Sequence, residues 1–137
     1  MRAQIALITI FTDDMPAMLR FYRDVLGFQP QRAPDSDDPG GYVEFKHDGV
    51  RFALCRRAVM AQAGLEGYTG PVTGHPFELA FPCESPGDVD ASYAALVAKG
   101  ATPVLGPADM PWNQRTAFIA DPDGNIHEIF ADLPPSA

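Results

Sequence analysis

The first half of the chain has the pattern of a strand, a helix and three further strands. Residues 5–11 are apolar and largely β-branched, which is typical of a strand. The next apolar positions are spaced like one face of a helix, for which Asp13-Asp14 offers an N-cap and Gly27 a stop. Three strands are predicted after this helix, near residues 28–31 and at 42–47 and 50–56, the last two joined by the turn dipeptide Asp48-Gly49.

The second half repeats this order of elements. Residues 77–82 have the pattern of a strand, and Ser85-Pro86-Gly87-Asp88 is typical of the start of a helix, which would end at Gly100. Three more strands are predicted, at residues 102–105, 115–120 and 125–130. Gly100 lies 73 residues after Gly27, and Gly124 lies 75 residues after Gly49. A nearly constant period of this kind indicates a duplicated supersecondary unit.

The duplication predicts an α+β fold made of two βαβββ modules. They are expected at about residues 4–56 and 76–132, within a single domain of residues 1–137, because the chain has the length of one ordinary domain. Residues 57–75 contain several glycines and are interpreted as the linker. Neither module alone buries both faces of its sheet, so we expect the two to form one curved sheet around a cavity.

Three motifs resemble those of a known family. The sequence Phe21-Tyr22-x-x-x-Leu26-Gly27-Phe28 is similar to the opening of modules in the glyoxalase/bleomycin-resistance/dioxygenase, or vicinal oxygen chelate (VOC), superfamily. The segment 121–130, with Asp-Pro-Asp-Gly-Asn followed by His-Glu-Ile-Phe, resembles their closing strand. The segment 111–115 is similar to Pro-Trp-Gly-Gln-Arg of the resistance-protein branch, with Asn113 in place of glycine. The resemblance covers about residues 5–130 and implies the βαβββ fold.

The same family places up to four metal ligands in its cavity, one from each of four strands. The resemblance puts the first at Leu7, which cannot bind a metal, and the second at Ala53, with Cys55 as the less favoured register. Glu78 and Glu128 correspond to the third and fourth positions. We therefore expect no bound metal. A divalent metal at Glu78 and Glu128 is the alternative, because Mg²⁺ accepts one or two carboxylates together with waters.

Strand alternation places Glu78 and Glu128 on the concave side of the sheet without reference to the family. Side chains two positions apart share a face, and the alternate positions around each glutamate form the apolar set that a helix should cover. A charged side chain inside a sheet seldom lacks a partner. We expect the two carboxylates to hydrogen-bond Arg51, Arg115 or a polar ligand.

Charge and composition exclude several classes of function. A net charge of −8 argues against nucleic-acid binding, which needs clustered Lys and Arg; the only basic cluster, Arg56-Arg57, is expected to be solvated. No run approaches the ~20 apolar residues of a membrane helix, and the N-terminus lacks the features of a signal peptide, so a cytoplasmic protein without a membrane partner is expected. Cys55 and Cys83 form no CxxC pair and are interpreted as buried thiols.

Two functions of different classes remain. The favoured one is a binding protein that sequesters a small, partly aromatic or cationic compound without metal, as the resemblance to resistance proteins implies. Its candidate ligand-binding residues are Leu7, Glu78, Trp112, Arg115 and Glu128. The alternative is a metal-dependent enzyme, either a glyoxalase-type lyase or isomerase or a dioxygenase, that uses Glu78 and Glu128. A ferredoxin-like interaction domain fits less well, because two hairpin turns in register favour the βαβββ repeat. No catalytic residue is predicted.

Trp112 and the histidines have simpler interpretations beside the functional ones. Trp112, the only tryptophan, either fills the core or forms a wall on which a ligand stacks. His127 neighbours Glu128 and should point to the other face of its strand, whereas His47 and His75 are expected at a hairpin end and in a loop. A homodimer is expected, because related proteins close their half-open sheets by pairing modules within or between chains.

Overall fold

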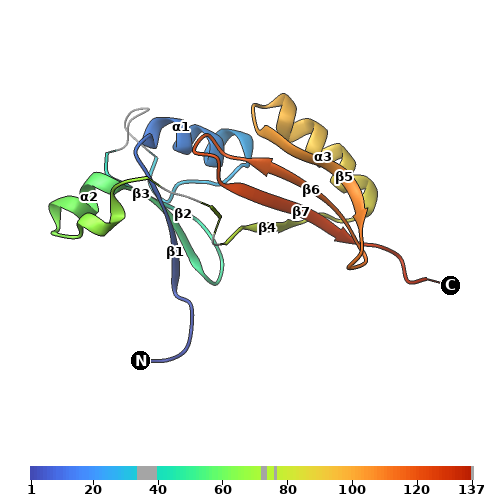
Figure 1. Cartoon of the computed structure of the whole chain (residues 1–137), viewed down its shortest axis with the longest axis horizontal. Coiled ribbons are helices and arrows are strands. Elements are labelled where there is room, and N and C mark those ends of the chain that lie inside the picture. The colour runs from blue at the N-terminus through green and yellow to red at the C-terminus, as the bar shows by residue number, and fades with distance from the viewer. Residues whose placement is uncertain (34–39, 72–73, 76, 137) are drawn as a thin grey trace. The chain divides into compact units, whose positions relative to one another are not determined.

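The computed structural model describes residues 1–33, 40–71, 74–75 and 77–136, and the chain divides into two compact units. The first unit is Met1–Thr73 and the second is Gly74–Ala137. Each contains one sheet with its own helices, so the fold is α+β as predicted (Figure 1). The strands form two separately hydrogen-bonded sheets, one of three strands and one of four. No helix within the described ranges is both long and apolar enough to cross a membrane.

The first unit has the strand order β1-β3-β2. β1 (Leu7–Thr12) pairs in parallel with β3 (Arg51–Arg56), which pairs antiparallel with β2 (Tyr42–Phe45). The helix α1 (Met15–Arg20) follows β1, and its N-cap Asp14 accepts a hydrogen bond from the Ala17 N–H at 3.1 Å. Asp14 was within the predicted cap, so this start is confirmed.

The strand predicted near residues 28–31 is reduced to a single bridge between Pro30 and Phe45. Two backbone hydrogen bonds flank this bridge: the Gln31 N–H donates to the Glu44 carbonyl at 2.8 Å, and the Lys46 N–H donates to the Gln29 carbonyl at 2.7 Å. Pro30 has no N–H, which limits the length of such a pairing. The position of the strand predicted near residues 28–31 was right, but its length was not. Residues 34–39, between this strand and β2, lie outside the described part of the chain.

The first helix ends in a π-helical turn, Phe21–Val25, rather than as one α-helix to Leu26. The Leu26 N–H donates to the Phe21 carbonyl at 3.0 Å, five residues earlier. This wider turn brings Phe21 and Tyr22 into the core together, with 2% and 0% exposure. Tyr22 packs edge-to-face on Phe52 of β3, with ring centroids 5.4 Å apart.

The segment predicted as a linker contains helical structure. Residues 57–75 include α2 (Arg57–Gln62) and a 3₁₀ turn at Glu66–Tyr68. The glycines of this segment suggested a loop, but α2 consists mainly of good helix formers and ends before Gly64. Helix propensity therefore predicted the structure of this segment better than its glycine content did.

The second unit has the strand order β4-β7-β6-β5. Its bounds are β4 (Ala80–Pro82), β5 (Thr102–Met110), β6 (Gln114–Ala120) and β7 (Ile126–Asp132). β4 is parallel to β7, and the other two pairs are antiparallel. The helix α3 (Pro86–Ala98) packs on this sheet, with Val89 buried against Ala117 and Ile129. The Ser85 side chain accepts a hydrogen bond from the Asp88 N–H at 3.1 Å, as the capping motif predicted.

Strand β5 is longer than the predicted 102–105 and continues to Met110. Its pairing with β6 shifts register twice, between Pro103 and Leu105 and between Leu105 and Ala108. Pro103 and Pro107 are tolerated because β5 is an edge strand that pairs on one side only. The proline- and glycine-rich sequence therefore indicated bulges rather than the end of the strand.

The two units share one connectivity, which confirms the predicted duplication. In each, the first strand pairs in parallel with the last, and the last pairs antiparallel with the strand that precedes it. β1, β2 and β3 thus correspond to β4, β6 and β7. The bridge at Pro30 takes the place of β5.

Candidate functional site

The structure brings the carboxyl groups of Glu78 and Glu128 together in the second unit. Glu78 lies just before β4, and Glu128 lies in β7, where its N–H donates to the Leu79 carbonyl at 2.9 Å. Burial raises the pKa of Glu128, and so do a side-chain hydrogen bond that the Glu78 carboxylate accepts from it and the negative charge of that carboxylate. A hydrogen bond between two carboxyl groups requires one of them to carry a proton. The two glutamates therefore form a pair that can share a proton.

This pair lies on the face of the sheet that α3 does not cover. In β7 the buried residues His127, Ile129 and Ala131 alternate with the half-buried Glu128 and Phe130. The core under α3 includes Ile129 and Ala131, so Glu128 points to the opposite side, as strand alternation predicted.

The same face carries aromatic side chains and one unsatisfied hydroxyl group. Phe118 of β6 lies directly across from Glu128, and Thr116 lies across from Phe130. Thr116 is fully buried, and its Oγ1 has no hydrogen-bond partner among the described residues. A buried polar group without a partner costs about 1–3 kcal/mol, which a ligand or a water could recover. Sequence reasoning did not single out Thr116, although a hydroxyl residue within an apolar strand is a visible signal.

The donor set does not fit the metal centre of the family. Within the described ranges, no three His, Cys, Asp or Glu side chains lie close enough to hold a metal ion. Glu78 and Glu128 offer oxygen atoms only, whereas the transition metals favour sites with nitrogen or sulfur ligands. Leu7, which corresponds to the first ligand position, opens β1 in the other unit with an aliphatic side chain that is 37% exposed.

The arginines that sequence reasoning offered as partners are bound elsewhere. Arg115 donates from Nε to Asp90 at 2.7 Å and from Nη1 to Asp109 at 2.9 Å. It alternates in β6 with Thr116, so it lies on the face opposite Glu128. Arg51 donates to Glu44 at 2.6 and 3.0 Å. Of the predicted partners, a polar ligand remains for the glutamate pair.

Trp112 is part of the turn between β5 and β6 and is 57% exposed. It therefore does not fill the core, which was one of its two interpretations. It precedes the first residue of β6, Gln114, by two positions and Phe118 by six. Its exposure leaves the indole open to a ligand, and its contact with the ligand of Glu128 stays a prediction.

The histidines lie where strand alternation and turn signals placed them. His127 faces away from Glu128 and is 2% exposed, and its Nδ1 accepts a hydrogen bond from the Leu79 N–H at 3.3 Å. His47 is exposed, with its Nδ1 2.7 Å from the Val50 carbonyl, and His75 is exposed. Sequence reasoning missed the contact of His127 with Leu79, because a side-chain bond to another strand leaves no local pattern.

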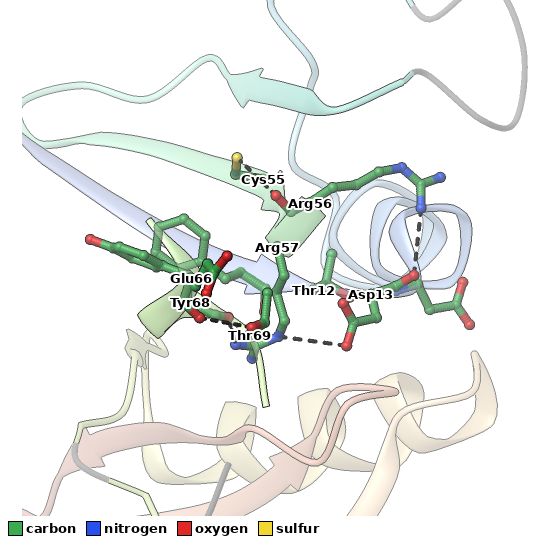
Figure 2. Close-up of polar contacts among 10 residues, drawn as sticks. Thr12, Asp13, Cys55, Arg56, Arg57, Glu66, Tyr68 and Thr69 are labelled. Atoms are coloured by element: carbon green, nitrogen blue, oxygen red, sulfur yellow. Dashed lines mark hydrogen bonds and ion pairs between the residues drawn. The ribbon is translucent and has the colours of Figure 1, made fainter. Parts of the chain in front are cut away.

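The basic pair Arg56-Arg57 ties segments of the first unit together rather than standing free in solvent (Figure 2). Arg57 donates to the carbonyls of Tyr68 at 2.8 Å and Phe11 at 3.3 Å, and its Nε lies 3.8 Å from an Asp13 carboxylate oxygen. These bonds attach the 3₁₀ turn to β1. The expectation that the pair is merely solvated was wrong, because backbone carbonyls occupy the donors of Arg57.

Comparisons with known proteins give one consistent assignment. The chain matches the model of the Glyoxalase/Bleomycin resistance protein/Dioxygenase superfamily over residues 4–129. A curated relative, the uncharacterized protein YraH of Bacillus subtilis (strain 168), is 29% identical over 133 residues, with 92% of this chain and 96% of that protein covered.

Solved structures agree with this match. A glyoxalase/bleomycin resistance protein/dioxygenase from Nocardioides is 29% identical, with a TM-score of 0.82 over 99% of this chain and 87% of that one. A glyoxalase/bleomycin resistance protein/dioxygenase family enzyme from Burkholderia phytofirmans PsJN is 25% identical, with a TM-score of 0.79 over 96% and 100% of the two chains. Together with the duplicated βαβββ connectivity, these matches show that the chain belongs to the glyoxalase/bleomycin resistance protein/dioxygenase superfamily.

Proposed function

We propose that the protein binds a small organic cation, an amine attached to an aromatic or other apolar group, at Glu78 and Glu128 and without a metal ion. The observation that carries this proposal is the pair of adjacent carboxyl groups on the sheet face opposite α3. Membership of a superfamily that includes ligand-sequestering resistance proteins is consistent with it.

Electrostatics favour a cationic group at this pair. Full ionisation of Glu78 and Glu128 places two negative charges side by side, and burial makes the charged form of Glu128 still less favourable. An ammonium group removes this repulsion and donates up to three hydrogen bonds, which the two carboxylates can accept. Ligand binding should therefore lower the pKa of Glu128.

The remainder of the face favours an apolar ligand body with a second polar group. Phe118 lies across from Glu128 and offers an aromatic surface, and Phe130 follows on the same face. Thr116 lies two positions from Phe118, about 7 Å along β6. A ligand that carries a hydroxyl group at that distance from its ammonium would supply the partner that Thr116 lacks.

Calorimetric titration with three related probes tests this proposal. Phenethylamine carries the cation, phenethyl alcohol is its neutral analogue, and tyramine adds a hydroxyl at the far end of the ring. We expect phenethylamine to bind at least about tenfold more tightly than the alcohol, or about 1.4 kcal/mol. Glu128→Gln should abolish this preference. Glu44→Gln, at a glutamate that is paired with Arg51, is the matched control and should leave it unchanged.

Thr116→Val provides a separate test of the second polar contact. It removes the unsatisfied hydroxyl, so the free protein should become more stable by about 1 kcal/mol. Any advantage of tyramine over phenethylamine should disappear in this variant. Equal affinity for amine and alcohol, or no measurable binding of any probe, would contradict the proposal.

A metal-dependent activity has no comparable support in the donor set. Protein purified without added metal should carry well under one equivalent of Zn, Ni, Mn or Fe by elemental analysis, because no three donor side chains gather among the described residues. Near-stoichiometric metal that is lost in Glu128→Gln would overturn the metal-free proposal in favour of the enzyme.

A further inference from the structure

His127 contacts the backbone that carries Glu78 from the far side of the sheet. It precedes Glu128 in β7, and its Nδ1 accepts a hydrogen bond from the Leu79 N–H at 3.3 Å. The Leu79 carbonyl accepts a hydrogen bond from the Glu128 N–H at 2.9 Å. Both polar backbone groups of Leu79 are thus held by β7. The peptide bond between Glu78 and Leu79 therefore has a fixed orientation.

The imidazole takes the place of a backbone bond. In a parallel pair, the donor and acceptor of one residue bond to the neighbours of its partner. Given the bond from the Glu128 N–H to the Leu79 carbonyl, a regular ladder would direct the Leu79 N–H to the Ile126 carbonyl. It bonds to His127 instead, and β4 as a strand begins only at Ala80.

The first unit shows the same segment with a regular ladder. There β1 pairs with β3 from Leu7 onward, and the Arg51 N–H donates to the Ala6 carbonyl at 3.0 Å. The 75-residue offset between the two hairpin glycines aligns His127 with Phe52, which is buried in the aromatic core. The βαβββ connectivity therefore does not need a histidine at this position, since phenylalanine serves in the corresponding place.

The surroundings of His127 favour the neutral ring that this bond requires. Burial lowers its pKa, and the negative charges of Asp121 and Glu78, together with a hydrogen bond from the ring to the Ile126 backbone, oppose that effect in part. An Asp121 carboxylate oxygen lies 3.9 Å from Nε2, and the Phe81 ring packs edge-on at 6.1 Å between centroids. Because Nδ1 accepts the Leu79 N–H, the hydrogen-bond pattern assigns the proton of the neutral ring to Nε2.

We infer that His127 is a positioning residue for the carboxyl pair: its imidazole supplies the missing bond to Leu79 and thereby holds Glu78 beside Glu128. The inference deepens the proposed amine site and rests on that proposal for its functional meaning. The ring lies on the buried face of β7, so it acts on a ligand through the position of Glu78 and not by contact.

Three variants of the full chain separate positioning from simple packing. His127→Phe copies the residue of the first unit, keeps an aromatic ring and removes the acceptor. His127→Asn retains an oxygen acceptor near the position of Nδ1. Ile119 is a buried residue of β6 that pairs directly with His127 of β7. Ile119→Val removes one methylene there and is the packing control. All three are studied without ligand, so a failure of amine binding does not affect the outcome.

Two measurements report on the inference. Amide hydrogen exchange at Leu79 should become roughly tenfold faster in His127→Phe, as expected for the loss of one hydrogen bond. In a carbon-13 NMR titration, the pKa of Glu128 should fall, because the Glu78 carboxylate no longer lies close enough to accept its proton and to repel its charged form. His127→Asn should restore both values toward those of the unmodified protein, and Ile119→Val should change neither.

A double-mutant cycle links the effect to Glu78. In a Glu78→Gln background, His127→Phe should have no further effect on the titration of Glu128, because the interaction it disrupts has already been removed. An unchanged Glu128 titration in His127→Phe, despite faster exchange at Leu79, would overturn the inference. The inference would also be overturned if His127→Phe shifted the pKa of Glu128 equally with and without the Glu78→Gln substitution.

Discussion

Asn113 is the only residue other than glycine with a left-handed backbone in the described ranges, with φ at 64°. It closes the turn between β5 and β6, where its N–H donates to the Met110 carbonyl at 3.1 Å and its carbonyl accepts from the Leu133 N–H at 3.0 Å. Asparagine tolerates this conformation better than most residues, and glycine adopts it freely. The backbone thus explains how Asn113 can replace the glycine of the similar resistance-protein segment.

Substitutions at Asn113 should follow this backbone requirement. Asn113→Val should lower the free energy of unfolding by about 1–2 kcal/mol, because a β-branched residue is strained at this φ. Asn113→Gly should change it by no more than about 0.5 kcal/mol. Urea unfolding of both variants measures the difference. Equal stabilities would mean that the turn relaxes to another conformation.

Glu128 and Glu44 should shift stability with pH in opposite directions. Burial and then Glu78 raise the pKa of Glu128, so its cost to the folded state appears as the pH rises from the unfolded-state value through the folded-state one. Hydrogen bonds from Arg51 and Tyr42 lower the pKa of Glu44 to about 2, so its contribution is present above the unfolded-state value and is lost as the pH falls.

Denaturant unfolding across a pH series tests this contrast. Glu128→Gln should be more stable than the unmodified protein at neutral pH and should lose that advantage in acid. Glu44→Gln should be less stable at neutral pH, and the deficit should shrink on acidification. The same sign for both variants would contradict the assignment.

Part of the site could be predicted from single residues and part could not. Alternation along β7 correctly placed Glu128 on the face opposite α3, and Glu78 interacts with it. The same rule, applied to β6, would have placed Arg115 with Ala117 on the helix-covered face. The exposure of Trp112 depends on how neighbouring elements pack, and no local pattern records that.

At the scale of elements, hydrogen-bond registry accounts for the differences from prediction. Spacing of apolar residues averages over a whole helix, so it could not distinguish an α-helix to Leu26 from α1 followed by a π-helical turn. Glycines led to the prediction of a linker where α2 forms, and prolines led to the prediction of a strand that ends before β5 does. Caps and hairpin turns were predicted correctly, because their chemistry is confined to a few adjacent residues.

Arg57 should be important for the segment that contains α2. Arg57→Met keeps much of the aliphatic length but removes hydrogen bonds to the Tyr68 and Phe11 carbonyls. We expect a loss of about 1–3 kcal/mol in unfolding free energy and faster proteolysis within residues 57–71. Lys99→Met, at an exposed cation after α3, is the control and should change stability by less than about 0.5 kcal/mol. Identical behaviour of the two variants would show that the Arg57 bonds are not needed.

At the scale of the whole molecule, the duplication was the most informative feature of the sequence. Two pairs of glycines with nearly equal offsets predicted two units, and the strand pairing within each unit confirms that their connectivity is the same. The mapping also explains why the second unit is the better candidate for chemistry. It carries Glu78 and Glu128, whereas Leu7 and Ala53 occupy the corresponding positions in the first unit.

We expect the protein to form a homodimer. β5 leaves Val104 and Leu105 exposed by 44% and 48%, and burial of apolar surface favours association by about 25 cal/mol per Å². Light scattering should give twice the chain mass of 14.8 kDa. Leu105→Glu should reduce it to one chain, whereas Ala94→Glu, at an exposed position of α3, should not. A monomeric mass for the unmodified protein at micromolar concentration would rule the dimer out.

The two prolines of β5 also bear on the solubility of the folded protein at high concentration. An edge strand with exposed apolar residues is a template onto which further chains can add, which leads to open-ended aggregates. Pro103 and Pro107 lack the N–H groups that such growth requires, and the register shifts beside them bend the edge. Replacement of both by valine would give a chain with the same fold that precipitates on storage.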